Sequence, residues 1–270
     1  STSQSRRLQG VRAATPPTDR PMPTRMSGFP SGDTRKLVLV RHGRTDWNLA
    51  KRAQGHTDIP LDEVGRAQAQ AMAPFVAALR PSRIWSSDLA RASQTAAYVA
   101  ALTGVTVEVD ARLREYSVGE RSGLTRVEFQ ERFPREYAAW LAEDETCLVP
   151  GAESTADVLA RMVPALRSFL AALGPGEVGV VVTHGACLRA AMLELIGLPL
   201  SADAAFATMG NCTWSTLQEA EFGGRLRVAA YNEGVPAHDH VDSCQDARVL
   251  WVVDSSVVAR LGVVIFRLLR

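Results

Sequence analysis

Continuous apolar stretches alternate along the chain with stretches of helical periodicity. Residues 36–40 and 179–183 are unbroken runs dominated by leucine and valine. An apolar run without polar alternation is typical of a strand that is buried on both faces of a parallel sheet. The shorter runs at 83–87 and 105–109 predict two further strands.

Five segments carry the periodicity or the end signals of helices. Asp62 stands near the start of the first of them, Asp88 is expected to cap the second, and Ser154 or Thr155 the fourth. The predicted helices span residues 57–79, 88–102, 124–141, 153–173 and 186–196. The apolar stripe of the first helix is formed by Val64, Ala67, Ala71, Phe75 and Ala78.

The order of these elements predicts the fold class. Strands that alternate with helices of this length imply right-handed crossovers and a mainly parallel sheet. Residues 212–217 and 226–230 flank a Gly223-Gly224 turn and predict a final hairpin. The expected fold is therefore α/β, a three-layer α/β/α sandwich with helices on both faces of a mainly parallel sheet.

The two ends of the chain differ in composition from the middle. Residues 1–34 are rich in Arg, Ser, Thr and Pro and lack apolar periodicity, so we expect a disordered leader, with a transit peptide as an open alternative. Residues 35–232 are expected to form one domain. The tail, 233–270, is apolar near its end, but charged residues interrupt it before the ~20 apolar residues of a membrane span are reached. An amphipathic appendage, an added segment and a dimer contact, and with it a homodimer, all stay open for this tail.

Charge and cysteine content argue against several classes of function. The chain has 30 Lys+Arg and 29 Asp+Glu, a formal charge of +1, which does not suit a protein that coats nucleic acid or a membrane surface. Its 4 cysteines form no C-x-x-C pair, which favours buried thiols in a reducing cytosol over a zinc or redox centre. His238 and His240 are interpreted as part of a solvated loop. We therefore expect a cytoplasmic protein without a metal or other cofactor and without a nucleic-acid or membrane partner.

The residues after the predicted strands carry most of the candidate chemistry. Ligands of open α/β sheets bind beyond the carboxyl ends of the strands. One edge of the sheet is therefore expected to collect two histidines, at least two arginines and a glutamate. The segments concerned are Arg41-His42-Gly43, residues 86–91 with Arg91, residues 112–115 with Glu115, and Thr183-His184-Gly185.

Such a set of side chains suits phosphoryl transfer. A neutral imidazole, with an ordinary pKa of about 6.5, is a good nucleophile near pH 7. Guanidinium groups bind phosphate oxygens in a bidentate way and disfavour protonation of a nearby histidine. A carboxyl group can protonate the leaving alkoxide and later accept a proton from water. Gly43 and Gly185 are expected to leave room for a substrate beside the backbone.

The segment L-V-R-H-G-R-T-D-W-N at residues 39–48 resembles the signature of the histidine phosphatase superfamily, in its phosphoglycerate-mutase-like branch. Further motifs follow in the family's order: Q-G, S-S-D-L-A-R-A-S-Q-T-A, L-R-E and T-H-G. The resemblance covers about residues 36–217. It implies a phosphoglycerate-mutase-like fold and a phosphatase that needs no metal.

The resemblance also implies roles for individual residues. His42 would be the nucleophile that carries the phosphoryl group, and Glu115 would be the general acid and base. Arg41, Arg91 and His184 would form the catalytic phosphate pocket. The residues implied to bind substrate are Arg41, Asn48, Gln54, Arg91 and His184.

Three assignments keep alternatives at this point. Glu120 competes with Glu115 for the role of the acid, and Glu115 is favoured because it stands in the L-R-E motif at a strand exit. His56 is interpreted as a loop histidine outside the chemistry, although a contact with substrate beyond the phosphate stays open. Residues 209–211 either belong to core and turn or shape the substrate pocket.

Mutases and phosphatases of this family share the first half-reaction. The choice between them depends on how far the segment between the glutamate and the second histidine covers the site and excludes water. The family's cofactor-dependent mutases carry a longer insertion between the glutamate and the second histidine. The shorter interval from Glu115 to His184 favours hydrolysis of a small phosphorylated metabolite. The motif combination is similar to that of actinobacterial enzymes acting on glucosyl-3-phosphoglycerate, so this or another sugar or glycerate phosphate is expected. Phosphoglycerate mutase, α-ribazole phosphatase and a catalytically idle module that only binds phosphate are the alternatives.

Overall fold

The structure, a computed structural model, describes residues 33–220 and 225–235. Nearly all of these residues belong to one compact unit, which ends at Gly234. The expected leader and tail therefore fall almost entirely outside the described residues, as do the Gly223-Gly224 turn, the His238/His240 pair and Cys244. Within the described ranges, no helix has the length and apolar character that crossing a membrane requires.

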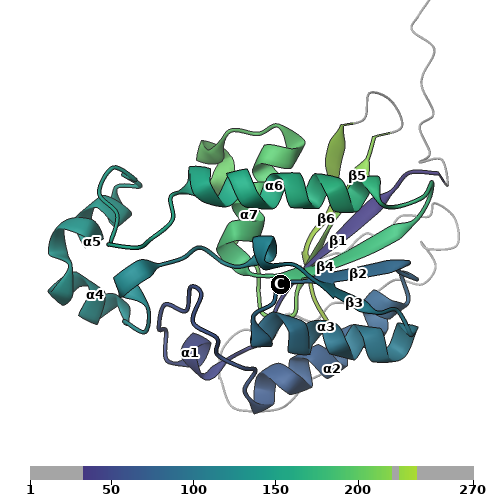
Figure 1. Cartoon of the computed structure of the whole chain (residues 1–270), viewed down its shortest axis with the longest axis horizontal. Helices are drawn as coiled ribbons and strands as arrows, with labels where there is room; N and C mark the ends of the chain where they lie inside the picture. The colour runs from purple at the N-terminus through teal and green to yellow at the C-terminus, as the bar shows by residue number, and fades with distance from the viewer. Residues whose placement is uncertain (1–32, 221–224, 236–270) are drawn as a thin grey trace, which may run out of the picture. The chain divides into compact units, whose positions relative to one another are not determined.

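The centre of the fold is a six-stranded sheet in the order β3-β2-β4-β1-β5-β6 (Figure 1). The first four strands in this order are parallel, whereas β5 pairs antiparallel with β1 and β6 antiparallel with β5. The predicted mainly parallel sheet and the final hairpin are confirmed. The strands are β1 (Lys36–Arg41), β2 (Arg83–Ser86), β3 (Val107–Val109), β4 (Val178–Thr183), β5 (Trp214–Glu219) and β6 (Leu226–Glu233).

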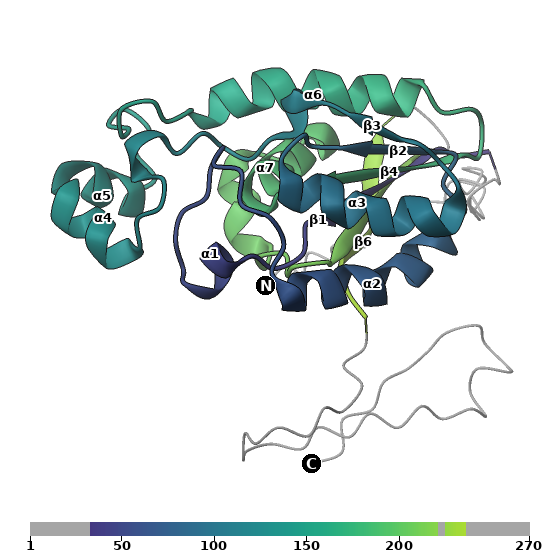
Figure 2. The ribbon, with the colours of Figure 1, turned by 60° about the horizontal axis from the view of Figure 1, so that its bottom comes forward.

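Helices cover both faces of the sheet and confirm the three-layer sandwich. Helices α6 and α7 lie on one face and α2 and α3 on the other, while α4 and α5 lie beyond one end of the layers (Figures 1 and 2). The α-helices are α1 (Asp46–Leu49), α2 (Glu63–Ala77), α3 (Ala90–Thr103), α4 (Arg126–Arg132), α5 (Pro134–Leu141), α6 (Thr155–Ala171) and α7 (Gly185–Ile196). The described residues also form the short 3₁₀ helices η1 (Ala111–Leu113), η2 (Gly119–Arg121) and η3 (Leu200–Ala205).

Strand β1 is buried on both faces, as its continuous apolar sequence predicts. Leu37 and Leu39 belong to a core cluster that also contains residues of α6 and α7. Val38 and Val40 are equally buried and, because side chains alternate along a strand, face the α2–α3 layer. Burial on both faces fixes the position of the strand, and with it the position of the residues that follow it.

Helix α2 begins later than predicted and buries a different face. Residues 57–62 form a loop, and Asp62 is the N-cap, whose carboxylate accepts a hydrogen bond from the Gly65 N–H at 2.6 Å. A Cβ on Gly65 would lie 2.0 Å from the carbonyl oxygen of Arg44, so only the face with this glycine can pack against the loop after β1. The predicted stripe was wrong: all five of its residues are exposed. The buried residues are Gly65, Ala69, Met72, Ala73 and Val76.

Two more helix predictions need correction. Asp88 does not cap α3; it pairs with Arg114, and the free N–H of Ala90 donates instead to the carboxylate of Asp58 at 2.6 Å. The single helix predicted over 124–141 is divided into α4 and α5 at Phe133, because the residue before a proline avoids the helical conformation.

The register of the parallel strands aligns their carboxyl ends. Arg41 of β1 is opposite Thr183 of β4, and Ser86 of β2 is opposite Val182. The segments that follow these strands therefore emerge side by side at one edge of the sheet. This edge carries the candidate site.

Candidate active site

His42 follows β1 directly and is 4% exposed. Its backbone N–H donates to the carbonyl oxygen of Thr183 at 3.0 Å, which ties the residue to the end of β4. The ring Nδ1 lies 2.7 Å from the carbonyl oxygen of Gly43. Because a carbonyl only accepts, Nδ1 carries the proton and Nε2 is left with its lone pair free. Burial, together with the charges of Arg91 and Arg41, holds the pKa of His42 well below its ordinary value.

Arg91 lies on the first turn of α3 and is 1% exposed. Its guanidinium donates to the carbonyl oxygens of Gly55 at 2.8 Å and Thr57 at 2.9 Å, and to Nδ1 of His184 at 3.2 Å. Burial lowers the pKa of Arg91 to about 10, so the group still carries its charge at neutral pH. Two of its five N–H donors remain for an anion.

Arg41 is the second cation beside His42. Its guanidinium donates to the carbonyl oxygen of Met209, while its buried Nε has no hydrogen-bond partner among the described residues. Burial lowers the pKa of this group, against the raising effect of Glu115. A buried donor without an acceptor is costly, and an anion in the site would supply the missing partner.

His184 is completely buried beside His42, with the ring centroids 5.1 Å apart. Because Arg91 donates to Nδ1, the proton of His184 is on Nε2, which donates to Ser87 Oγ at 3.0 Å. Burial lowers the pKa of His184, and the charge of Arg91 adds to the effect. His184 is therefore neutral and orients the Arg91 guanidinium.

Glu115 follows η1 and reaches the N-terminus of α7. Its Oε1 accepts hydrogen bonds from the N–H groups of Tyr116 at 3.0 Å and Cys187 at 2.9 Å. Its Oε2 accepts from the N–H of Ala186 at 3.0 Å. The competing residue, Glu120, is exposed and lies 3.9 Å from Arg132 on the surface. The geometry thus brings Glu115, and not Glu120, to the edge that carries the histidines.

Asn48 and Gln54 differ in how closely the structure connects them to His42. Asn211 donates through Nδ2 to the backbone oxygen of His42 at 2.9 Å and to Oδ1 of Asn48 at 3.4 Å, so Asn48 is held near His42. Gln54 precedes Gly55, whose carbonyl holds Arg91, and its buried Oε1 has no partner among the described residues.

The two glycines after the histidines both lie close to other parts of the protein. A Cβ on Gly43 would lie 2.6 Å from the carbonyl oxygen of Gly65, so this glycine allows α2 to approach. A Cβ on Gly185 would lie 3.2 Å from Nε of Arg41. Neighbouring protein atoms constrain both positions; the expected room for a substrate stays a prediction.

The sequence did not predict the contacts that several groups make at this edge. His56, interpreted as a loop histidine, lies with Nε2 at 2.8 Å from the carbonyl oxygen of Glu115. Asn211 was left undecided between turn and pocket. The carbonyl groups that hold Arg91 and the α7 N–H groups that hold Glu115 belong to the backbone, which has no signal in a side-chain pattern.

The described residues contain no group of three or more His, Cys, Asp or Glu side chains arranged to hold a metal ion. The arrangement consists instead of two neutral histidines, the buried Arg91, the partly buried Arg41 and a carboxyl group. These are the components that the chemistry of phosphoryl transfer requires.

Comparison with known proteins gives the family. A sequence profile of the histidine phosphatase superfamily (branch 1) matches residues 37–232. The chain is 40% identical over 190 residues to a glucosyl-3-phosphoglycerate phosphatase of Mycobacterium tuberculosis, and the match covers 68% of this chain and 85% of that protein. It is 36% identical over 188 residues to a probable phosphoglycerate mutase of Yersinia pestis, with 69% and 86% covered.

Solved structures agree with this result. A structure named mycobacterial hydrolase 1 superposes with a TM-score of 0.69 at 38% identity and covers 74% of this chain and 99% of its own. A mycobacterial glucosyl-3-phosphoglycerate phosphatase in complex with VO3 superposes with a TM-score of 0.67 at 38% identity, covering 73% and 98%. The chain therefore belongs to the histidine phosphatase superfamily, and its phosphatase relatives support a hydrolase of phosphoric monoesters.

Proposed function

We propose that this enzyme hydrolyses the phosphomonoester of a small sugar or glycerate derivative through a phosphohistidine formed on His42. The observation that carries the proposal is the state of this ring. Nδ1 is held by the Gly43 carbonyl, Nε2 is unprotonated, and the charges of Arg91 and Arg41 both act against protonation of the ring. A nucleophile that is kept neutral at physiological pH beside Arg41 and Arg91 is suited to attack a phosphate dianion.

In the first half-reaction, Nε2 of His42 attacks phosphorus and the bond to the ester oxygen breaks. The leaving oxygen takes a proton from the carboxyl group of Glu115. Three N–H groups occupy both lone pairs of Oε1 and one lone pair of Oε2, which leaves one position on Oε2 for this proton. Arg41 and Arg91 stabilise the charge on the transferring phosphoryl oxygens.

In the second half-reaction, the carboxylate of Glu115 accepts a proton from water. The oxygen of that water attacks phosphorus, the bond from phosphorus to Nε2 breaks, and inorganic phosphate leaves. His42 returns to its neutral state and Glu115 to its protonated state. The cycle thus uses one water and releases one alcohol and one phosphate.

The chemistry of the leaving alcohol is suggested by a cavity beside the acid. This cavity, of about 250 Å³, includes His56, and His56 contacts the Glu115 carbonyl. The cavity is also lined by the hydroxyl-bearing residues Thr57, Ser117 and Ser122. Such residues suit an alcohol that itself carries several hydroxyl groups. Glucosyl-3-phosphoglycerate, the substrate in the name of the 40% identical relative, is therefore our first candidate. The lining residues are His56, Thr57, Ser117, Val118, Gly119 and Ser122.

A phosphoglycerate mutase is the second candidate, because a relative of 36% identity is named as a probable one. A mutase would transfer the phosphoryl group back to glycerate, whereas a hydrolase transfers it to water.

We also propose a reducing, cytosolic location, which is supported by the free thiols of Cys147, Cys187 and Cys212 among the described residues.

The test is a substrate panel in the presence of EDTA. It contains glucosyl-3-phosphoglycerate, 3-phosphoglycerate, phosphoserine and α-ribazole phosphate, and released phosphate is measured. We expect release to be fastest from glucosyl-3-phosphoglycerate. Interconversion of phosphoglycerates without phosphate release would indicate a mutase. Binding of phosphate by a folded protein that releases none from any member would indicate an idle binding module, and both results would contradict the proposal.

A further inference from the structure

Arg161, in the middle of α6, contacts the segment that carries Glu115. Its Nη1 donates to the carbonyl oxygens of Arg112 at 2.8 Å and Arg114 at 2.7 Å. Its Nη2 donates to the carbonyl oxygen of Glu115 itself at 2.8 Å. One guanidinium thus binds three carbonyl groups within four consecutive residues.

The opposite side of the same guanidinium is fixed by Glu153. Nε of Arg161 lies 2.9 Å from Oε1 and Nη2 lies 2.9 Å from Oε2, which is a bidentate ion pair with side chains only 18% and 21% exposed. Oε2 of Glu153 also accepts the Ser117 N–H at 2.7 Å, and the Glu153 N–H donates to the Ser117 carbonyl at 2.9 Å. The pair therefore holds the segment on both sides of Glu115.

The segment needs such partners because it has no regular structure. Residues 114–117 belong to neither a helix nor a strand, so their carbonyl groups have no ladder to join. The Glu115 carbonyl receives two donors, Nη2 of Arg161 and Nε2 of His56 at 2.8 Å. Removal of the Arg161 side chain would leave three carbonyl groups without this donor and would free the backbone on which the acid stands.

We propose that Arg161 is a positioning residue for the general acid: it clamps the backbone of residues 112–115 so that Oε2 of Glu115 is held at the leaving oxygen. The inference rests on the acid role proposed above for Glu115. It predicts a defect confined to the step in which a proton is delivered. A misplacement of about 1 Å at a reacting group costs on the order of 10²-fold in rate.

The test compares two substrates that differ in their need for a proton. An alkyl phosphate such as 3-phosphoglycerate has a poor leaving group, whereas p-nitrophenolate departs with little protonation. The quantity measured is kcat/KM, which reports the phosphorylation step for both. For Arg161→Gln we expect a loss of ~30–100-fold with the alkyl ester and less than about threefold with p-nitrophenyl phosphate.

Conservative and control variants separate position from charge and from folding. Arg161→Lys keeps the charge but not the fork, and we expect about a tenfold loss with the alkyl ester to persist. Arg167→Gln, on the same helix, removes an exposed arginine without a partner in the described part of the chain and is expected to leave both values within about twofold. Full recovery in Arg161→Lys would attribute the effect to charge and overturn the proposal.

Failure of the inference and failure of the acid assignment are distinguishable. Glu115→Gln should show the same preference for the aryl ester, only more strongly. If Glu115→Gln slows both esters equally, the acid role falls. If Glu115→Gln discriminates and Arg161→Gln does not, the positioning role alone is overturned. Should Arg161→Gln fail to fold, Glu153→Gln releases the same clamp from its other side, and an unchanged ratio of the two esters in that variant overturns the inference.

Discussion

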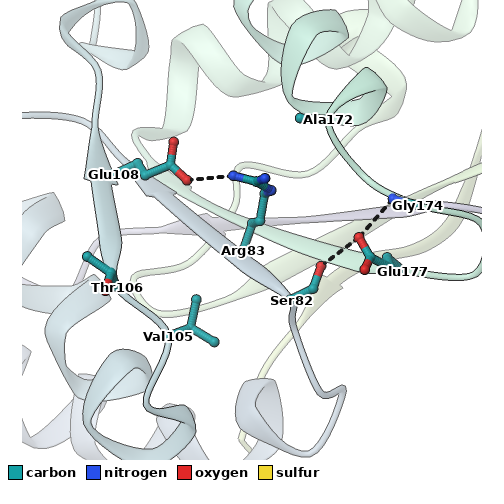
Figure 3. A pocket seen from close by; sticks show the side chains of 8 residues that line it. All are labelled: Ser82, Arg83, Val105, Thr106, Glu108, Ala172, Gly174 and Glu177. Carbon is teal, nitrogen blue, oxygen red and sulfur yellow. Dashed lines mark hydrogen bonds and ion pairs between the residues drawn. The ribbon is translucent and has the colours of Figure 1, made fainter.

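The two edges of the sheet carry similar types of charged residues, but these are largely buried at the carboxyl edge and exposed to solvent at the amino edge. At the carboxyl edge, Arg91 is 1% exposed and Nε of Arg41 is buried without a partner. At the amino edge lies a cavity of about 480 Å³, lined by residues that precede β2, β3 and β4 and by Arg83 of β2 and Glu108 of β3 (Figure 3). There Arg83 pairs with Glu108 at 3.1 Å, with side chains 46% and 52% exposed, and Glu177 accepts from Ser82 Oγ and the Gly174 N–H.

This difference shows that the size of a cavity does not identify a site. The charges of the larger cavity are solvated and satisfy one another, so a ligand would gain little there. At the carboxyl edge, Arg91 is buried and Arg41 partly buried, carbonyl groups hold both in place, and both have donors left over for an anion. Function is expected where burial has left polar groups partly unsatisfied. The following predictions test this contrast.

Substitution of His42 should have the largest effect. His42→Ala removes the proposed acceptor of the phosphoryl group, and kcat/KM should fall by about 10⁴-fold or more. Phosphate release from the preferred substrate measures the loss, and circular dichroism establishes that the fold is kept. Activity within tenfold of the wild type would mean that another group is the nucleophile.

Substitution of Arg91 should have the next largest effect. Arg91→Ala removes a buried charge from the transferring phosphoryl group and should lower kcat/KM by about 10²–10³-fold, or about 2.7–4 kcal/mol. Arg91→Lys should recover only a part, because an ammonium group cannot hold both the Gly55 and Thr57 carbonyls and still bind phosphate as a fork. A kcat/KM that stays unchanged in Arg91→Ala would exclude this residue from the phosphate pocket.

The buried histidines should make the stability of the fold depend on pH. Burial lowers the pKa values of both His42 and His184. Below about pH 6.5 these histidines therefore bind protons in the unfolded chain but stay unprotonated in the native protein. Stability is therefore highest above this pH and is lost on acidification. From pH 7.5 to 5.5 the loss should be on the order of 1 kcal/mol for each histidine.

Urea unfolding at these two pH values measures this effect. The free energy of unfolding should differ less between the two pH values in His42→Ala than in the wild type. The reduction should equal the contribution of one histidine. An identical difference in wild type and variant would show that His42 does not resist protonation in the native state. Comparison with the variant is needed because carboxylates also contribute to the loss at low pH.

The smallest effect is expected at the amino edge. Arg83→Ala breaks an exposed ion pair with Glu108, and such pairs contribute about 0–1 kcal/mol. The catalytic parameters should stay within about twofold of the wild type. A loss of tenfold or more in kcat/KM would remove the distinction between the two edges and would make the larger cavity a functional site.

The sequence predicted the framework of the fold because its strongest signals are local. The continuous runs of β1 and β4 indicate strands buried on both faces, and Ser154 is indeed the N-cap of α6. The buried face of α2 was predicted wrongly because its many alanines allow two stripes. The choice between them depends on the approach of the Arg44 carbonyl to Gly65, which is a tertiary contact.

The candidate site shows the same limit. Side chains at strand exits, such as His42 and His184, could be predicted to meet because parallel strands end at one edge. Their partners could not. Arg161 lies within an amphipathic helix, where an arginine usually faces solvent. The Asp88 carboxylate was expected to cap a helix but pairs with Arg114. Hydrogen bonds to the backbone follow from the packed fold and have no separate pattern in the sequence.

The central claim, that the buried imidazole of His42 accepts the phosphoryl group, is tested most directly by trapping. A radiolabelled phosphomonoester is mixed with the enzyme, turnover is stopped with alkaline detergent, and the labelled peptide is sequenced by mass spectrometry. The account predicts label on the peptide that contains His42, stable to alkali, lost in acid and absent from His42→Ala. Label on the His184 peptide, or complete turnover without labelled protein at any time, would contradict it.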